Sequence, residues 1–148
     1  KGSGIINSLF HGYDIWKGNI PQRTNGVLVA DRKGKITSYA SLAMNDRGEL
    51  FFDVGTEVYA GMIIGERNKT GDLDVNITKE KKLTNMRSST SEATVNLRAI
   101  KKLSLDQCIE FISEDELLEV TPQNIRLRKM ELDIHKRNAK QKTMKAKE

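Results

Sequence analysis

The alternation of apolar and polar positions along the chain predicts mainly β structure. Residues 5–13 place successive side chains on two opposite faces, with the period of two that is typical of a strand. Residues 14–22 contain Gly18 and Pro21, which indicate a linker. We therefore expect a domain boundary within this linker.

Short apolar runs alternate with turn signals between residues 26 and 77. The strands that this pattern predicts are Val27–Ala30, Ile36–Ala43, Leu50–Phe52, Met62–Glu66 and Leu73–Ile77. The segments between them are rich in Gly, Asp and Asn, which favour turns. Regularly spaced short strands of this kind are typical of a small antiparallel barrel or a curled sheet.

Residues 78–94 interrupt the strand pattern. They are mostly polar and contain neither Gly nor Pro, and they are long for a connection inside a compact domain. Such a length favours a loop that is either functional or disordered. Two further strands are predicted after it, at Val95–Ile100 and at Ile125–Arg128.

A helix is predicted between these two strands. Ser104 and Gln107 have the spacing of a capping box, and the helix is expected to run from Leu105 to about Ser113. Its buried face would carry Leu105, Cys108, Ile109 and Ile112. From Met130 onward the sequence favours a basic helix or a frayed tail. The fold class that we expect is therefore mainly β: a small antiparallel barrel-like domain with one or two helices and a basic C-terminal tail.

Charge is distributed unevenly along the chain. The net charge of the 148 residues is +5, yet residues 126–148 alone contain nine Lys or Arg and three acidic residues. The preceding residues are therefore close to neutral. A basic block attached to a neutral body is typical of polyanion binding, because Lys and Arg displace counterions from phosphates. The alternative is a tail that is merely solvated.

The sequence contains no recognisable catalytic or metal-binding constellation, so we expect no cofactor, metal or small-molecule substrate for this chain. Cys108 is the only cysteine, and its apolar neighbours predict a buried position. His11 and His135 lie in separate segments without neighbouring metal ligands. The acidic residues from Glu110 to Glu119 are expected to form a solvated surface at a helix end.

Three fragments imitate nucleotide-binding motifs, and we interpret all three as turns. Gly34 and Lys35 are followed by Ile36, and Val29 stands where a phosphate-binding loop needs its first glycine. Residues 31–34 and 68–72 imitate the other two nucleotide motifs, but the first lies in a predicted hairpin turn and the second misses the required spacing by one residue.

No apolar run is long enough to cross a bilayer or resembles a signal peptide. We therefore expect a cytoplasmic protein without a membrane partner.

Four stretches carry a resemblance to a known family. They are Gln22–Leu28, Val58–Glu66, Lys81–Arg87 and Glu119–Lys129. With them the chain resembles the C-terminal region of the TypA/BipA family of ribosome-binding translational GTPases, over most of its length. The resemblance implies that residues 1–16 are the last strand of an elongation-factor-G-like fifth domain plus a linker. Residues 17–129 would then be the C-terminal β domain of this family, and residues 130–148 a basic tail.

The resemblance also implies a function for the parent protein. Such a parent hydrolyses GTP with Mg²⁺ in a G domain that would lie upstream of Lys1, acts in stress adaptation and assists assembly of the large ribosomal subunit. This fragment itself would not be an enzyme. Its expected partner is the ribosome, chiefly large-subunit rRNA, with the acceptor end of tRNA as a further contact.

By position, the loop that follows residue 80 looks like the element that reaches RNA. Lysines supply point charges for phosphates, Arg supplies bidentate contacts, and Thr and Asn add neutral hydrogen bonds. The predicted RNA-binding residues are Lys81, Lys82, Thr84, Asn85 and Arg87 in the loop, and Arg126, Arg128, Lys129, Lys136 and Arg137 in the basic C-terminal region. The scarcity of aromatic residues argues against a stacking platform for single strands.

Two other classes of function stay open at this point. A protein-interaction domain would use the acidic residues 114–119 or an exposed barrel edge. An independent hydrolase is the weakest alternative, because no candidate base lies near the lone serines in sequence.

Overall fold

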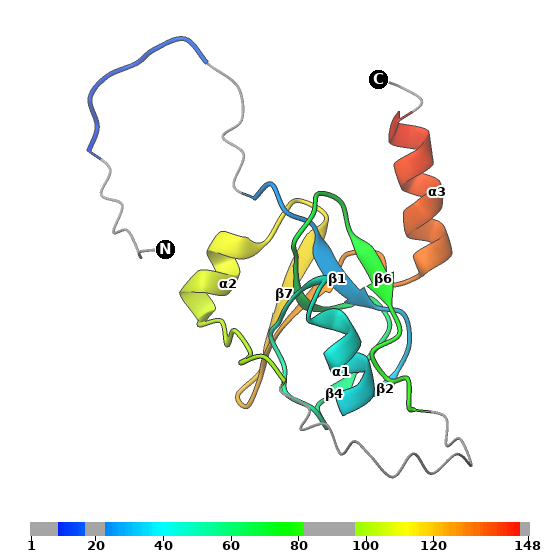
Figure 1. Cartoon of the computed structure of the whole chain (residues 1–148). Coiled ribbons are helices and arrows are strands. Elements are labelled where there is room, and N and C mark those ends of the chain that lie inside the picture. Colours follow the sequence, from blue (N-terminus) through cyan, green and yellow to red (C-terminus); the bar gives the residue numbers. More distant parts are fainter. Residues whose placement is uncertain (1–8, 17–22, 82–96, 146–148) are drawn as a thin grey trace.

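The computed structural model describes residues 9–16, 23–81 and 97–145 of the chain. These residues build a sheet with one helix against each face, and a third helix projects from the body (Figure 1). In chain order the elements are β1 (Val27–Ala30), β2 (Gly34–Lys35), α1 (Ser38–Met44), β3 (Gly48–Leu50), β4 (Glu57–Val58), β5 (Met62–Arg67), β6 (Leu73–Val75), α2 (Leu105–Phe111), β7 (Glu116–Val120), β8 (Ile125–Lys129) and α3 (Ile134–Lys145).

The main sheet has six strands in the order β6-β1-β5-β8-β7, and β3 also pairs with β5. All of these pairs are antiparallel except β1 with β6, which is parallel. β6 follows β5 after a short turn but pairs with β1, so it runs in the same direction as β1. The predicted mainly β class is confirmed, but the barrel-like description is loose, because the sheet is mixed and is not closed into a barrel.

The core occupies both faces of β1 and β5. On one face Leu28 and Ile64 pack with residues of α1, and on the other face Val29 and Ile63 pack with Cys108 of α2. A strand buried on both sides shows a continuous apolar run instead of alternation. This explains why β1 is apolar at every position, and the predicted burial of Cys108 is confirmed.

The strand predicted at Ile36–Ala43 is wrong, because most of this segment is helix α1. Thr37 caps the helix by accepting a hydrogen bond from the Ala40 N–H, at 3.2 Å. Ile36, Ala40 and Met44 are all buried, and their spacing of four places them on one side of the turn and helix. The apolar residues of this segment therefore follow the period of a helix and not the period of two of a strand.

The predicted capping box of α2 is confirmed, and its buried face is partly wrong. Ser104 accepts a hydrogen bond from the Gln107 N–H, while the Gln107 side chain accepts one from the Ser104 N–H. Cys108 and Ile112 pack against the core, but Leu105 and Ile109 are exposed. Phe111 takes part in the contact instead, edge-on against Phe51 with ring centroids 5.4 Å apart.

Two other predicted strands fall partly outside the described residues. The described part of the strand predicted at 95–100, residues 97–100, is not a strand, and Leu97, Arg98 and Ala99 are exposed. Residues 9–16 likewise form neither helix nor strand, and their apolar side chains are exposed. The strand predicted at Ile125–Arg128 is confirmed as β8, and the basic tail is confirmed as helical from Ile134 to Lys145.

The capping box of α2 gives a first prediction. Replacing Ser104 by Ala removes an acceptor for a backbone N–H, and we expect the free energy of unfolding to fall by about 1 kcal/mol. Ser104→Asp keeps an acceptor at the same place and should lower it by only a few tenths of a kcal/mol. Urea denaturation measures both, and an equal loss in the two variants would contradict the capping role.

Candidate nucleic-acid interface

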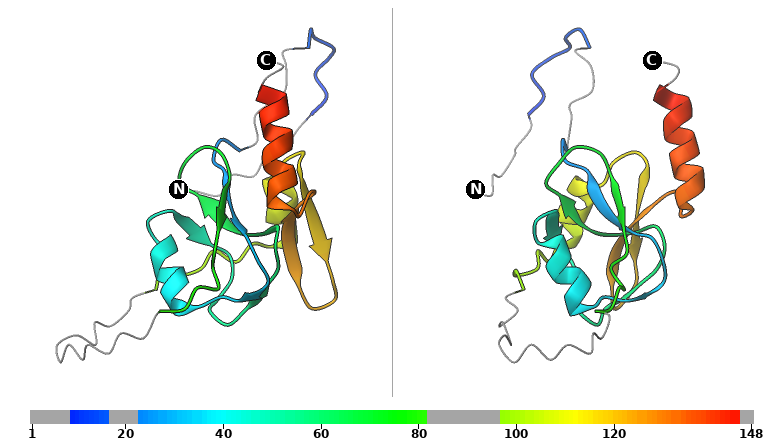
Figure 2. Two further views of the ribbon diagram at one scale, coloured as in Figure 1. Left: turned by 90° about the vertical axis from the view of Figure 1, so that its right-hand side faces the viewer. Right: turned by 45° about the vertical axis from the view of Figure 1, so that its right-hand side comes forward.

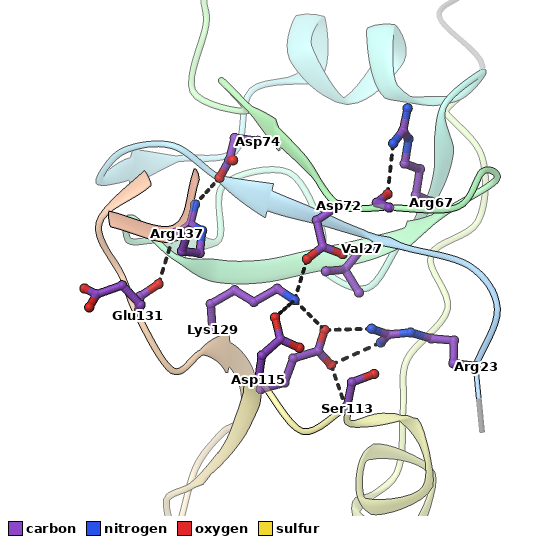
Figure 3. A network of polar contacts seen from close by, with 12 residues as sticks. Arg23, Val27, Arg67, Asp72, Asp74, Ser113, Asp115, Lys129, Glu131 and Arg137 are labelled. Carbon is purple, nitrogen blue, oxygen red and sulfur yellow. Dashed lines mark hydrogen bonds and ion pairs between the residues drawn. The ribbon is translucent and has the colours of Figure 1, made fainter. Parts of the chain in front are cut away.

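Lys129, one of the predicted RNA-binding residues, lies inside the protein. Its side chain is only 2% exposed, and its ammonium lies 2.6 Å from Asp72, 2.8 Å from Asp115 and 2.9 Å from Glu116 (Figure 3). Lys129 shares its face of β8 with Leu127, because side chains alternate along a strand. In register, Glu116 of β7 is its direct cross-strand partner.

Glu116 carries the network from Lys129 to Arg23. Its side chain is fully buried and accepts two hydrogen bonds from the Arg23 guanidinium, at 2.7 and 3.1 Å. The N–H of Ser113 donates a third, at 3.1 Å. Arg23 also donates to the carbonyl of Phe111 and lies 4.4 Å above the centre of the Phe111 ring. The network therefore fixes residue 23 against the end of α2 and the start of β7.

These contacts correct two predictions. The acidic residues between Glu110 and Glu119 are not all solvated, because Glu116 is buried, and Asp115 pairs with Lys129 although its own side chain is 62% exposed. Lys129 has its three donors engaged by carboxylates of its own chain, so it is not available to bind RNA. A buried charge has to be paired, and this constraint explains both corrections.

The outer face of the β7–β8 hairpin carries Arg126 and Arg128. Arg128 Nε lies 2.7 Å from Glu119, which also accepts a hydrogen bond of 2.5 Å from the hydroxyl of Tyr59. Burial and this hydrogen bond raise the pKa of Tyr59. Arg126 faces Glu119 across the ladder and has no hydrogen bond or ion pair with any residue that the structure describes. Of the two arginines, Arg126 is therefore the more available to an external anion.

Helix α3 holds the other two predicted residues of the C-terminal region. Lys136 is exposed, whereas the Arg137 side chain is only 10% exposed and pairs with Asp74 of β6. The same guanidinium donates to the carbonyls of Glu131 and Leu132, at 3.0 and 2.8 Å. Lys140, one turn further, is 67% exposed. α3 projects away from the sheet in both views of Figure 2.

The predicted loop residues lie mostly outside the described part of the chain. Lys81 is described and is exposed, whereas Lys82, Thr84, Asn85 and Arg87 fall outside it. The segment that ends at Lys81 and helix α3 lie at opposite ends of the molecule (Figures 1 and 2). Among the predicted residues that the structure describes, Lys81 and the residues of α3 thus lie on distant surfaces and not in one patch.

Among the described residues, no group of three or more His, Cys, Asp or Glu side chains is arranged to hold a metal ion. Within the same residues, no helix is both long and apolar enough to cross a membrane.

Comparison with known proteins matches residues 25–134 to the TypA/BipA C-terminal domain family. The chain belongs to this family. The matched region contains the whole sheet, Lys129 with its three acidic partners and the start of α3, while Arg23 lies just before it. The resemblance read from the sequence is therefore confirmed.

Three relatives called "Large ribosomal subunit assembly factor BipA" are similar over nearly the whole chain. The protein of Bacillus subtilis is 44% identical over 138 residues, which are 93% of this chain and 22% of the relative. That of Salmonella typhimurium is 47% identical over 133 residues, 89% of this chain and 22% of the relative. That of Haemophilus influenzae is 46% identical over 144 residues, 97% of this chain and 23% of the relative. The chain thus spans less than a quarter of the length of these TypA/BipA relatives.

Sequence reasoning missed the ion network, although one signal for it was present. Lys129 continues the inward positions of Ile125 and Leu127, and a charged residue at an inward position requires a buried partner. Glu116 and Asp72 lie 13 and 57 residues away in the sequence, so no local pattern identifies them as these partners. Arg23 is still more remote in the sequence, 93 residues from Glu116.

The network gives a second prediction. Glu116→Gln removes a buried negative charge that two cations share, and we expect the free energy of unfolding to fall by roughly 3 kcal/mol. The matched control is Glu114→Gln, the same change at an exposed position two residues away, which should stay within about 0.5 kcal/mol of the parent. Equal stabilities of the two variants in urea would show that the buried pair is not what holds these segments together.

A third prediction concerns alkaline pH. Burial lowers the pKa of Lys129, but Asp115, Asp72 and Glu116 outweigh it, and the pKa is raised above the ordinary value of 10.5. The folded protein therefore binds this proton more tightly than the unfolded chain does. The resulting stabilisation is complete below pH 10.5 and is lost as the pH rises through the folded value.

Unfolding measured across this alkaline range tests the assignment. The parent protein should lose stability as the pH rises, and Lys129→Met should lower stability at neutral pH but show a shallower alkaline decline. Parallel curves for the two proteins would contradict it.

Proposed function

We propose that this chain is the ribosome-binding C-terminal module of a translational GTPase and that it contacts large-subunit rRNA. The observation that carries the proposal is α3, a basic helix that projects from the sheet with exposed lysines (Figure 2). Exposed Lys and Arg gain affinity for phosphates by releasing counterions. The name of the relatives, an assembly factor of the large ribosomal subunit, supports RNA as the polyanion.

In this proposal the segment that begins at Lys81 makes a second contact at the other end of the domain. Lys82 and Arg87 would bind phosphates, and Thr84 and Asn85 would add hydrogen bonds to sugars or bases. The acceptor end of tRNA on the large subunit is the target that we assign to this segment. Arg126 adds an available guanidinium on the hairpin, while Lys129 is left out of the proposed RNA surface because its charge is used internally.

The activity of the whole protein is inferred from the family. Because the chain spans only 22 to 23% of its relatives, we assign GTP and Mg²⁺ binding to a G domain elsewhere in a longer protein. Hydrolysis, a role in stress adaptation and large-subunit assembly would belong to that longer protein in the cytoplasm. The part played by this chain would be binding to the ribosome.

The competing function, a protein-interaction domain, finds less support. Of the acidic residues that it would use, Glu116 is buried, Asp115 pairs with Lys129, and Glu119 pairs with Arg128. The edge strands β6 and β7 are three and five residues long, and short edges offer little for the addition of another strand.

The loop contact gives a fourth prediction. Replacing Lys81, Lys82 and Arg87 together by Ala should weaken co-sedimentation of the chain with large ribosomal subunits. Each phosphate contact that is lost should reduce the slope of log affinity against log salt by about 0.7 to 0.9. Thermal unfolding should barely change, because exposed charges usually alter stability by no more than about 0.5 kcal/mol.

A matched control removes the same number of charges elsewhere. Arg47, Lys69 and Lys102 are all exposed, and their replacement by Ala should leave the salt dependence of binding nearly unchanged. If both triple variants sedimented like the parent at every salt concentration, the proposed loop contact would be wrong. If both were weakened equally, the binding would depend on net charge alone.

A further inference from the structure

The base of α3 is held by a helix cap and a close ion pair, whereas further along the helix Lys140 makes a longer ion pair, 3.8 Å, with Glu131 of the segment before α3. Asp133 caps the helix by accepting hydrogen bonds from the N–H groups of His135 and Lys136, at 2.7 and 3.1 Å. Arg137, in the first turn, pairs with Asp74 of β6 and donates to two backbone carbonyls just before the helix. The guanidinium therefore connects the helix, the segment before it and the sheet (Figure 3).

A second contact lies beside this ion pair. Leu132 packs so close to Gly61 that a Cβ atom added to the glycine would lie 2.7 Å from its side chain and 2.8 Å from its Cα. Gly61 also has φ +85°, a conformation that other residues rarely adopt. Any side chain at this position would push the segment that leads into α3 away from the sheet.

The part of α3 whose side chains the structure describes has no apolar stripe with which to pack. Its apolar residues Ile134 and Ala139 are five positions apart, so they lie on different sides of the helix. A helix without an apolar face is not held by burial. Its direction relative to the sheet therefore depends on the contacts of Leu132 and Arg137.

Resting on the proposed function, we propose that the Asp74–Arg137 ion pair and the Gly61–Leu132 contact hold α3 as a directed basic arm, whose exposed Lys136 and Lys140 bind phosphates of double-stranded RNA. Arg137 is then a positioning residue and makes no RNA contact itself. Asp74 supports RNA binding by holding Arg137, although its own negative charge would repel RNA.

The composition of α3 favours a duplex over other polyanions. Lys136 and Lys140 are four residues apart, so they lie on one face and about 6 Å apart along the axis. The helix contains no Phe, Tyr or Trp on which unpaired bases could stack. It also lacks the apolar face that an interfacial membrane helix inserts into lipid. A rigid row of charges without these features fits the regular phosphate backbone of an RNA helix, which is read by shape.

Three variants of the 148-residue chain separate the arm from its anchor. Lys136→Gln with Lys140→Gln removes the proposed contacts, together with the exposed Lys140–Glu131 pair, and leaves Asp74, Arg137, Gly61 and Leu132 in place. Asp74→Asn breaks the ion pair while it makes the net charge more positive by one. Arg137→Lys keeps the net charge, but a single ammonium cannot replace the guanidinium fork that reaches Asp74 and both carbonyls.

Binding is measured with an RNA duplex of about 20 base pairs, across about 50 to 200 mM salt. The double lysine variant should bind roughly tenfold more weakly at low salt, with the log-log slope reduced by about 1.4 to 1.8. Asp74→Asn and Arg137→Lys should both bind about two- to tenfold more weakly, because a released arm has to be ordered on binding. Their amide hydrogens in residues 134–140 should exchange faster than in the parent.

The sign of the Asp74→Asn effect decides the inference. An arm that acts only as a charged tail predicts equal or tighter binding, because a negative charge has been removed. Equal or tighter binding by Asp74→Asn and Arg137→Lys, beside a weakened double lysine variant, would overturn the anchor and leave the proposed function standing. Should Asp74→Asn unfold, Arg137→Lys alone gives the answer.

The remaining outcomes bear on the RNA contact itself. If the double lysine variant bound the duplex like the parent, Lys136 and Lys140 would not be RNA contacts. Ribosome binding would still be tested separately by the triple variant of Lys81, Lys82 and Arg87. If the parent chain bound neither the duplex nor large subunits, the proposed function and this inference would be overturned together. Tighter binding to a single strand, or to vesicles of anionic lipid, would overturn the assignment of a duplex.

Discussion

An ammonium group buried in a protein has to be surrounded by carboxylates, and the architecture of this domain follows from that requirement at Lys129. Of its three acidic partners, Asp72 immediately precedes β6, Asp115 immediately precedes β7 and Glu116 is the first residue of β7. Glu116 in turn holds Arg23, which precedes β1. The ion network therefore connects the segment before β1, the turn before β6 and the β7–β8 hairpin. Apolar burial fills the two faces of the sheet, but this charge requirement fixes how its segments meet.

The elements that could be predicted from the sequence are those whose signal is local. The apolar runs of β1 and β5, the alternation of β8 and the capping box at Ser104 each lie within a few residues. The mistaken strand at Ile36–Ala43 arose because short apolar segments fit a period of two and a period of 3.6 almost equally well. The cap at Thr37 distinguishes them.

The arrangement of the sheet and of its charges is not a local property. Nothing within Leu73–Val75 specifies that β6 pairs with β1 instead of β5, since the pairing depends on residues more than forty positions away. The same limit explains the basic residues. Composition marks the C-terminal region as positive, yet only the fold separates Lys129, which is neutralised inside, from Lys136, which faces solvent. The net charge of this region therefore overestimates the number of basic side chains that are available to a polyanion.

The position of α3 at the opposite end of the body from the segment that ends at Lys81 has a consequence for selectivity (Figure 1). Under the proposed function, two weak sites sit on one rigid body, and the second binding event becomes intramolecular once the first has occurred. The gain from such bivalency depends on geometry and disappears when both sites cannot be occupied together. An isolated RNA duplex, or an isolated acceptor end of tRNA, would then be bound weakly. A folded particle that presents both of these RNA elements at the right separation would be bound strongly. The distance across the domain would thus act as a ruler for the assembled state of its target.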